Sequence, residues 1–255
     1  MNPSCRAIAA AVLVTTLTLV AALAAPLARA AEDSAASAAK AQAAFFARDA
    51  AALSQLAAAT EPWAKSANSR EQYAHAYVQF RALQVAILQK REKDSQKSGG
   101  ACVDTLDALL KREPKSAEGL ALQSSCYGYL AGLGGMGAIR NGSRSGKSVE
   151  AALALEPKNP RVILADGFGI YHRPKFVGGD KAKGCAKFRE AATAFDAAAG
   201  AGVASTGIAW GAPEAHYWVG RCAVDAGNAA AAKQAYERAV ALAPDFLAAK
   251  QALAR

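Results

Sequence analysis

Apolar side chains recur every three or four residues along most of this chain, which is the spacing of one face of an α-helix. Between residues 70 and 91 they form a single stripe: Tyr73, Tyr77, Phe80, Leu83 and Ile87. No segment alternates apolar and polar residues as a half-buried strand would. The pattern predicts an all-α protein. Helices are expected over residues 34–59 (two short ones, broken near Arg48), 70–91, 101–112, 117–130, 147–155, 160–172, 181–199, 213–226, 229–243 and 245–255.

Polar and Gly-rich stretches separate these helices and predict the loops. They lie at residues 92–100, 132–137, 174–179 and 200–212. Pro114, Pro157 and Pro244 each stop a helix, and Pro160 and Pro213 each open one at the first-turn position that proline prefers. Asp180 and Asn228 are expected to cap the helices that follow them.

Composition supports a helical, globular chain. Alanine, the best helix former, supplies 68 of the 255 residues. The hydrophobic content of 53% with only 20% charged residues excludes global disorder. Because aromatic residues make up only 7%, the core must be built mainly from Ala, Leu and Val.

The first thirty residues have the features of a secretory signal peptide. An uncharged apolar run separates Arg6 from Arg29, Pro26 breaks it, and the small residues Ala28 and Ala30 suit a signal peptidase. Cleavage is expected after Ala30, and the periplasm is the expected location. The alternative is an uncleaved membrane anchor, since the run is long enough to span a bilayer. The predicted organisation is a signal peptide (1–30), an N-terminal helical segment (31–69) and a repeat domain (70–255).

Charge and candidate ligands exclude several classes of function. Without Arg6 and Arg29 the chain has 28 basic and 21 acidic residues, spread along its length. Nucleic-acid binding would need clustered bases with stacking aromatics, so the favoured interpretation is a solvated basic surface near anionic envelope lipids or polymers. No C-x-x-C motif occurs and the three histidines are far apart in sequence. Neither a metal site nor a cofactor is therefore predicted.

The last helix pair carries the spacing of a known repeat. Between Pro213 and Pro244 the marker positions are Gly220, Gly227, Ala232, Tyr236, Ala239 and Pro244. In this pattern the chain resembles the tetratricopeptide repeat (TPR) family, in which small residues let two antiparallel helices touch and a glycine makes the turn. The preceding unit matches with an insertion, at Pro160, Gly167, Gly184, Phe188 and Ala191. Two earlier units match more faintly, so the resemblance covers about residues 70–255 and is strong only at the end.

The resemblance implies a superhelix of stacked helix pairs whose concave face binds a peptide or protein. The last unit departs from the family pattern at Ala223, where tyrosine is usual, and at His216, where tryptophan is usual. The favoured function is a non-catalytic scaffold or adaptor that binds another envelope protein. The alternative is an envelope enzyme, a hydrolase or transferase of cell-envelope polymers built on helical repeats. No catalytic constellation of residues supports that alternative.

In the family the first helix of each pair lines the concave groove, which selects candidate binding residues. Spacing along these helices places Leu164, Glu214 and Val224 on the inward stripe, and the earlier unit contributes only small or polar residues such as Ser125. Tyrosine and arginine often carry binding energy. The predicted partner-binding residues are Arg161, Phe168, Tyr171, Tyr217 and Arg221. The alternative is that this stripe packs against the N-terminal or C-terminal helices.

The four cysteines that follow the leader predict two disulfides in an exported chain. Cys102 and Cys185 lie early on the second helix of a pair, and Cys126 and Cys222 lie late on the first helix of the next pair. Consecutive helices run antiparallel, so the expected bonds are Cys102–Cys126 and Cys185–Cys222. The alternative is four buried thiols.

Three further features have weaker signals. Residues 141–148 (NGSRSGKS) are one residue away from a phosphate-binding loop, but no strand precedes them, and a flexible basic loop is favoured over a nucleotide site. His172 and His216 lack a partner at catalytic spacing and are interpreted as helix-end or groove side chains. Residues 171–180 (YHRPKFVGGD) form either a ligand edge or, in the favoured interpretation, a wide turn.

Overall fold

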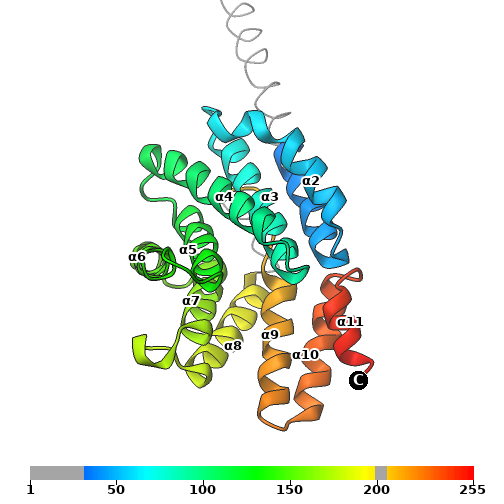
Figure 1. Cartoon of the computed structure of the whole chain (residues 1–255). Coiled ribbons are helices and arrows are strands. Elements are labelled where there is room, and N and C mark those ends of the chain that lie inside the picture. Colours follow the sequence, from blue (N-terminus) through cyan, green and yellow to red (C-terminus); the bar gives the residue numbers. More distant parts are fainter. Residues whose placement is uncertain (1–31, 199–205) are drawn as a thin grey trace, which may run out of the picture.

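The computed structural model describes residues 32–198 and 206–255, and the predicted signal peptide lies outside them. Every regular element in these two ranges is a helix (Figure 1). No helix in this part of the chain has both the length and the apolar character needed to cross a membrane. The elements are an N-terminal helix over residues 32–47, α2 (Ala50–Ala59), η1 (Glu61–Lys65), α3 (Ser69–Leu88), α4 (Glu92–Arg112), α5 (Ala117–Gly132), α6 (Ala138–Leu155), α7 (Pro160–His172), η2 (Lys175–Val177), α8 (Lys181–Ala198), α9 (Ala212–Asp225), α10 (Ala229–Leu242) and α11 (Leu247–Leu253).

Capping residues and a turn glycine set where several helices begin and end. Asp49 breaks the first two helices apart and accepts a hydrogen bond from the backbone N–H of Ala52, as an N-cap does. Asn228 caps α10, and the Asp180 carboxylate accepts a bond from the Lys183 N–H at the start of α8, so both predicted caps are confirmed. Gly227 provides the turn between α9 and α10 at a φ of +71°, a conformation that favours glycine.

The helices pack as antiparallel pairs, and successive pairs stack on one another. The pairs are α3–α4, α5–α6, α7–α8 and α9–α10, joined by contacts of α4 with α5, α5 with α7, and α8 with α9. The fold class predicted from the sequence, a TPR-like stack of helix pairs, is confirmed by this packing.

Glycines allow the close approach within the last two pairs. A Cβ on Gly220 would lie 2.5 Å from the Tyr236 ring, and one on Gly167 would lie 3.0 Å from the Phe188 ring. The same contact of a first-helix glycine with a second-helix aromatic thus occurs twice. Gly184 is tighter still, because its Cβ would lie 2.6 Å from Tyr171 Cβ and 2.8 Å from Tyr171 Cα.

Alanine at Gly184 is expected to destabilise the protein by about 1–3 kcal/mol, because α7 and α8 must separate to admit one methyl group. Alanine at Gly100 is the matched control, since no atom lies within 4 Å of its Cβ position in the middle of α4. That change is expected to stabilise by about 0.5–1 kcal/mol through helix propensity. Urea unfolding followed by circular dichroism measures both, and equal effects at the two sites would contradict the close packing of α7 on α8.

The predicted loop at residues 92–100 is wrong, because these residues form the first turns of α4. Gly99, which suggested a loop, is the close contact with α5: its Cβ would lie 2.5 Å from Leu130 Cδ2. Ser95 is buried and donates to the Arg91 carbonyl, and Glu92 and Asp94 lie in the first turn, where carboxylates stabilise the helix dipole. Tertiary packing therefore overrides the weak local propensity.

The flexible loop expected at residues 141–148 is also wrong, since α6 begins at Ala138 and continues through this segment. The buried side of α6 is polar at Ser145 and Ser148 and becomes apolar at Val149 and Ala152. Ser145 donates to the Ser124 carbonyl, Ser124 donates to the Ser145 carbonyl, and Ser148 donates to the Gln123 amide oxygen. The first turns of α6 pack through serines and carry no apolar stripe, so periodicity could not reveal them. A helical backbone at these residues is also not a phosphate-binding loop.

Both disulfides have the predicted pairing. Cys102 bonds Cys126 with their Cα atoms 6.4 Å apart, and Cys185 bonds Cys222 with theirs 5.8 Å apart. Each joins the second helix of one pair to the first helix of the next. The recurrence shows that the inter-repeat contact is the same at both places.

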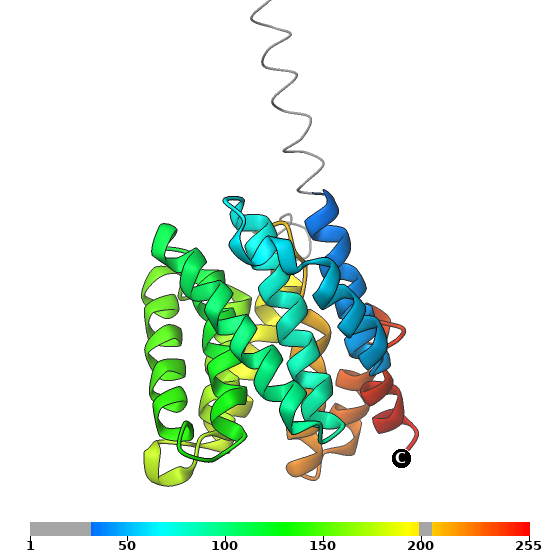
Figure 2. The same ribbon diagram turned by 45° about the horizontal axis from the view of Figure 1, so that its top comes forward.

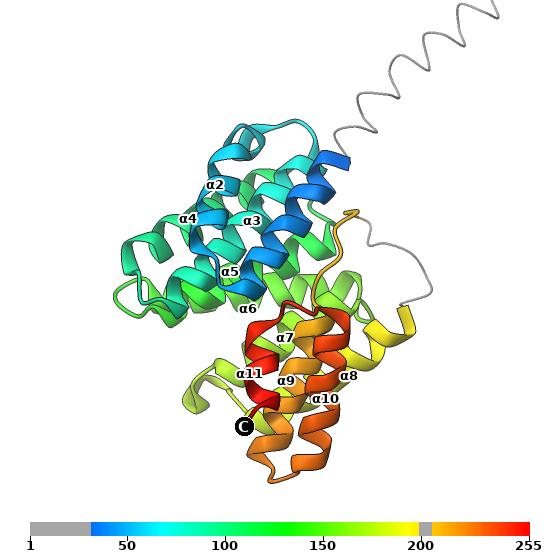
Figure 3. The same ribbon diagram turned by 90° about the vertical axis from the view of Figure 1, so that its right-hand side faces the viewer.

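The stack curves so that its two ends meet. In Figures 1 and 3 the blue N-terminal end of the stack reaches the red C-terminal end although the two are far apart in sequence, and α11 packs on α10. Phe46 of the N-terminal helix is buried against Phe246, with ring centroids 4.3 Å apart. This contact closes the arc around its concave side, where the candidate site lies.

Candidate functional site

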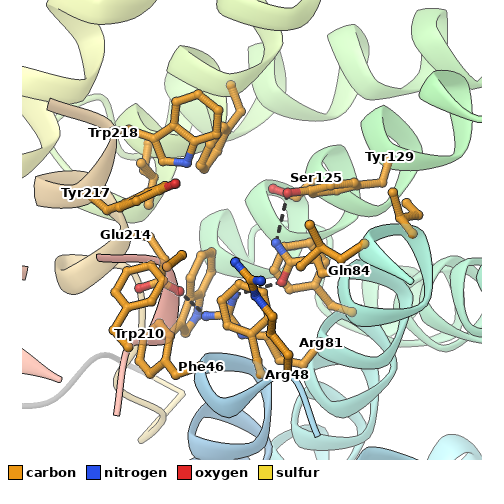
Figure 4. Close-up of a pocket in the computed structure, with 18 of the residues that line it drawn as sticks. Phe46, Arg48, Arg81, Gln84, Ser125, Tyr129, Trp210, Glu214, Tyr217 and Trp218 are labelled. Carbon is orange, nitrogen blue, oxygen red and sulfur yellow. Dashed lines mark hydrogen bonds and ion pairs between the residues drawn. The ribbon is translucent and has the colours of Figure 1, made fainter. Parts of the chain in front are cut away.

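A cavity of about 310 Å³ lies on the concave side of the stack. Its lining comes from almost every layer of the fold. Figure 4 shows Tyr217 and Trp218 on one side of it, Tyr129 opposite, and Arg81 with Gln84 below. The lining residues are Phe45, Phe46, Arg48, Phe80, Arg81, Gln84, Ile87, Leu88, Ser125, Tyr129, Leu164, Ala165, Phe168, Trp210, Glu214, Tyr217, Trp218, Arg221, Phe246 and Ala248.

Three of the five predicted binding residues line this cavity. Phe168 of α7 and Tyr217 and Arg221 of α9 contribute to its wall. Leu164, Glu214 and Ser125, also assigned to the inward stripe, line it as well, whereas Val224 does not and is 55% exposed at the end of α9. The first-helix rule therefore identifies part of the cavity wall, and the binding role of these residues stays a prediction.

Arg161 and Tyr171 lie outside the cavity. Arg161 is buried, with Nη1 3.0 Å from Glu118 Oε1 and Nη2 donating to the Ile208 carbonyl, so it ties α5 and α7 to the segment before α9. Tyr171 packs on Gly184, and its hydroxyl bonds Asp225. Burial and the nearby carboxylate raise the pKa of Tyr171. Both are structural contacts of neighbouring helices.

The floor of the cavity is a buried ion pair. Arg81 and Glu214 form a salt bridge with side-chain exposures of 1% and 8%. Arg81 also donates to the Tyr77 hydroxyl, the Gln84 amide oxygen and the Gln42 amide oxygen. Burial opposes the charge, but Tyr77 and Glu214 outweigh it, so the pKa of Arg81 is raised and the guanidinium remains cationic.

Aromatic rings surround this guanidinium. Its central carbon lies 4.4 Å from the Phe45 ring centroid, 4.8 Å from Tyr77 and 5.2 Å from Phe80. Such cation–π contacts are strongest where water is excluded. The network joins the N-terminal helix, α3 and α9 into one rigid base for the cavity.

The rim is more exposed and carries positive charge. The Arg221 guanidinium is exposed and lies 5.6 Å from the Trp218 ring centroid, and Arg48 lies on the tight turn before α2. Glu214 is the carboxylate among the lining residues, and Arg81 already neutralises it. The rim therefore favours a negatively charged group over a positive one.

The N-terminal helix fills part of the concave face. The sequence left this open as an alternative, in which the inward stripe packs against a terminal helix and not against a partner. Gln42 reaches Glu214 at 3.5 Å, and Tyr217 lies 5.1 Å from the Phe246 ring just before α11. Terminal helices thus cover the inner ends of the stripe. What remains is a pocket of limited size instead of a long open groove.

The histidines lie elsewhere. His216 contacts Asp196 at 3.3 Å, and burial outweighs that carboxylate and lowers the histidine's pKa. His172 stacks beside Phe168 and Trp218, and burial together with Lys181 and Arg221 lowers its pKa. Among the described residues no group of three or more His, Cys, Asp or Glu side chains is placed to hold a metal ion.

The sequence did not reveal several of the cavity's residues. Arg81, Gln84 and Phe80 lie on the apolar helix that follows residue 69, and Trp210 lies in a segment expected to be a linker. Trp210 is buried and donates to the Tyr73 hydroxyl at 3.0 Å. A tryptophan inside a Gly-rich linker was the one available signal that the linker packs inward.

No family model matches this chain, and no curated protein sequence matches it. Among solved structures, the chain is similar to the crystal structure of a thermophilic TPR protein of Thermus thermophilus. The two share 15% identity over 70% of this chain and 79% of that one, with a TM-score of 0.45. This similarity is too weak to support an argument. The helical-repeat architecture rests instead on the helix packing described above.

Proposed function

We propose that this chain is a non-catalytic binding module of the cell envelope. Its partner is an exported protein or peptide that inserts an apolar or aromatic side chain into the concave cavity. The observation that carries the proposal is the cavity itself, formed by aromatic rings from the N-terminal helix, α3, α5, α7 and α9 above a rigid ionic floor. A concave site with an apolar wall and a few placed polar groups is the usual form of a ligand pocket.

The positive charge at the cavity rim indicates which charge the bound partner should carry. Arg221 and Arg48 border the cavity, and the one lining carboxylate is paired. A carboxylate beside the inserted side chain, from Asp, Glu or a chain terminus, would therefore bind more tightly than a base. The volume of about 310 Å³ suits one or two side chains, so recognition of a short anchor is expected.

The proposed export depends on the apolar run before residue 31, together with the two disulfides. Disulfides persist in oxidising compartments such as the periplasm. Recovery from the periplasmic fraction of a chain that begins at Ala31 would support this location. Recovery of the full-length chain with free thiols from the cytoplasm would contradict it.

Selection from a phage-displayed peptide library tests the binding site. Peptides captured by the wild-type protein are expected to share an aromatic or large aliphatic residue next to an acidic one. Arg221→Ala should weaken a selected peptide about tenfold or more, since a charge-assisted hydrogen bond is lost. Ser125→Leu should fill the cavity and abolish binding. Fluorescence anisotropy with the labelled peptide measures all three proteins.

Arg238→Ala is the matched control. Arg238 is a half-exposed arginine on α10 whose partner is Asp196, and it lies outside the cavity lining. If this control weakened the peptide as much as Arg221→Ala, or if Ser125→Leu bound normally while remaining folded, the cavity would not be the binding site.

The enzyme alternative gains no support from the cavity. The carboxylate that lines it is held by Arg81, and the contacting pair His216 and Asp196 lies outside the cavity lining. A binding module needs only the shaped cavity, which the stacked pairs supply.

A further inference from the structure

Exposed apolar side chains gather at one end of the molecule. The first helices of the four pairs run in the same direction. The turns that join the two helices of each pair therefore all lie at one end of the molecule, the lower end in Figure 2. The described part of the chain has eight large apolar side chains that are exposed. Six of them lie at or beside these turns: Leu88, Met136, Ile139, Phe176, Val177 and Val224.

Two neighbouring turns carry the most exposed of these side chains. Met136, between α5 and α6, is 104% exposed, Ile139 in the first turn of α6 is 89% exposed, and Phe176, between α7 and α8, is 89% exposed. Arg173 of the second turn approaches α6, with Nη2 3.9 Å from the Cβ position of Gly146. Figure 2 shows both turns together at the lower left.

Bases surround these apolar tips. Arg140, Lys175 and Lys181 are exposed beside them, and none is ion-paired with an acid of the described ranges. Asp180 is the nearby acid, and it caps α8 and pairs with Lys183. The remaining acids of this end are Glu92 and Asp94, in the first turn of α4, and Asp225, which bonds Tyr171.

The loop that carries Phe176 is held rigidly in this outward pose. Gly178 and Gly179 donate to the Lys175 and Pro174 carbonyls, and Asp180 donates its N–H to the Ile170 carbonyl. Gly179 leaves no room for a side chain, because a Cβ would lie 1.7 Å from the Arg173 carbonyl oxygen. Phe176 is therefore exposed by a fixed backbone, and no ordering of the loop is needed when it binds.

We propose that these turns dock the protein on a bilayer that contains anionic lipids. The docking surface consists of Met136, Ile139, Arg140, Lys175, Phe176, Val177 and Lys181. Separate apolar tips can insert between lipid headgroups while neighbouring bases contact lipid phosphates. A protein partner would instead be expected to meet a packed patch with pockets, which isolated side chains on turns do not form. From the sequence alone, membrane insertion was expected only through the leader, and only if it is not cleaved.

Co-sedimentation with vesicles tests the proposal. The chain that begins at residue 31 retains every described residue and lacks the apolar leader, which would itself bind lipid. It is expected to bind vesicles of equal parts phosphatidylglycerol and phosphatidylcholine, to bind pure phosphatidylcholine much more weakly, and to dissociate as salt is raised. The double variant Phe176→Ser with Val177→Ser should reduce the apparent affinity about tenfold or more. Each of Lys175→Ser and Lys181→Ser should reduce it about fivefold.

Leu155→Ser and Leu242→Ser provide the matched control. Both leucines are 39% exposed and lie at the opposite ends of their helix pairs. These variants should bind vesicles as the wild type does, and unchanged melting temperatures would show that every variant is folded. Absence of vesicle binding by the wild type, or equal binding by the Phe176 and Val177 double variant, would overturn the proposal. The cavity and its peptide assay are untouched by these changes, so the two proposals succeed or fail separately.

Discussion

Replacing Glu214 with alanine is expected to lower the free energy of unfolding by about 3–5 kcal/mol, because it leaves the charge of Arg81 buried without a counterion. The pair lies where the N-terminal helix, α3 and α9 meet, and Arg81 is only 1% exposed. Gln42 and Tyr77 bond the guanidinium but carry no formal charge, so they do not replace the carboxylate. Denaturant unfolding of wild type and variant measures the difference.

Two further variants show whether the buried charge is the cause. Glu237→Ala breaks an exposed pair, in which Glu237 lies 3.8 Å from Lys233, and should cost less than about 1 kcal/mol. Replacing Arg81 by Met together with Glu214 by Leu should recover much of the loss, because a buried ion pair exchanged for apolar residues is often close to neutral. If Glu214→Ala lowers the free energy of unfolding by no more than Glu237→Ala does, the Arg81–Glu214 pair does not stabilise the fold.

Loss of either disulfide is expected to be the second large effect. The Cys185–Cys222 bond closes a separation of 37 residues and Cys102–Cys126 one of 24. Constraining loops of that size in the unfolded chain stabilises the folded state by about 3–4 kcal/mol for each bond. Double replacement of Cys185 and Cys222 by alanine should therefore lower the melting temperature markedly, and a reducing agent should do the same to the wild type.

Peptide mapping without reduction provides the control for this result. Digestion should release one peptide pair containing Cys102 and Cys126 and another containing Cys185 and Cys222. A peptide pair joining Cys102 to Cys185, or four thiols open to alkylation, would contradict both the pairing and its stabilising role.

Local signals explain which elements were predictable. The helix over Pro160–His172 was predicted from Pro160, which opens it, with an end near His172, because apolar periodicity is strong there. The helices α4 and α6 were truncated in the prediction because their buried sides carry Gly99 and Ser145, residues that are common in loops. Such residues favour a helix only when a partner helix supplies the contact, which Leu130 and Ser124 do here.

In the candidate site, too, some residues could be predicted from spacing and others depended on tertiary packing. Phe168, Tyr217 and Arg221 could be chosen because a repeat turns the same helix face inward each time. Arg161 follows the same spacing, yet Glu118 and the Ile208 carbonyl bind it in the interior. Whether an inward position lines a cavity or is covered depends on what packs beside it, and periodicity does not contain that information.

By itself the sequence determined the helical class, the order of the helix pairs, the glycine contacts of the last units and the pairing of the four cysteines. These features are local or recur from repeat to repeat, so spacing along the chain is enough to specify them. Only the tertiary structure decided that the N-terminal helix closes the arc against Phe246, that Trp210 and Arg81 form the base of a cavity, and that the turns carrying Met136 and Phe176 lie at the same end. Those features bring together residues that are far apart in sequence. Where these residues meet depends on the curvature of the stack, which all of its helix–helix contacts determine together.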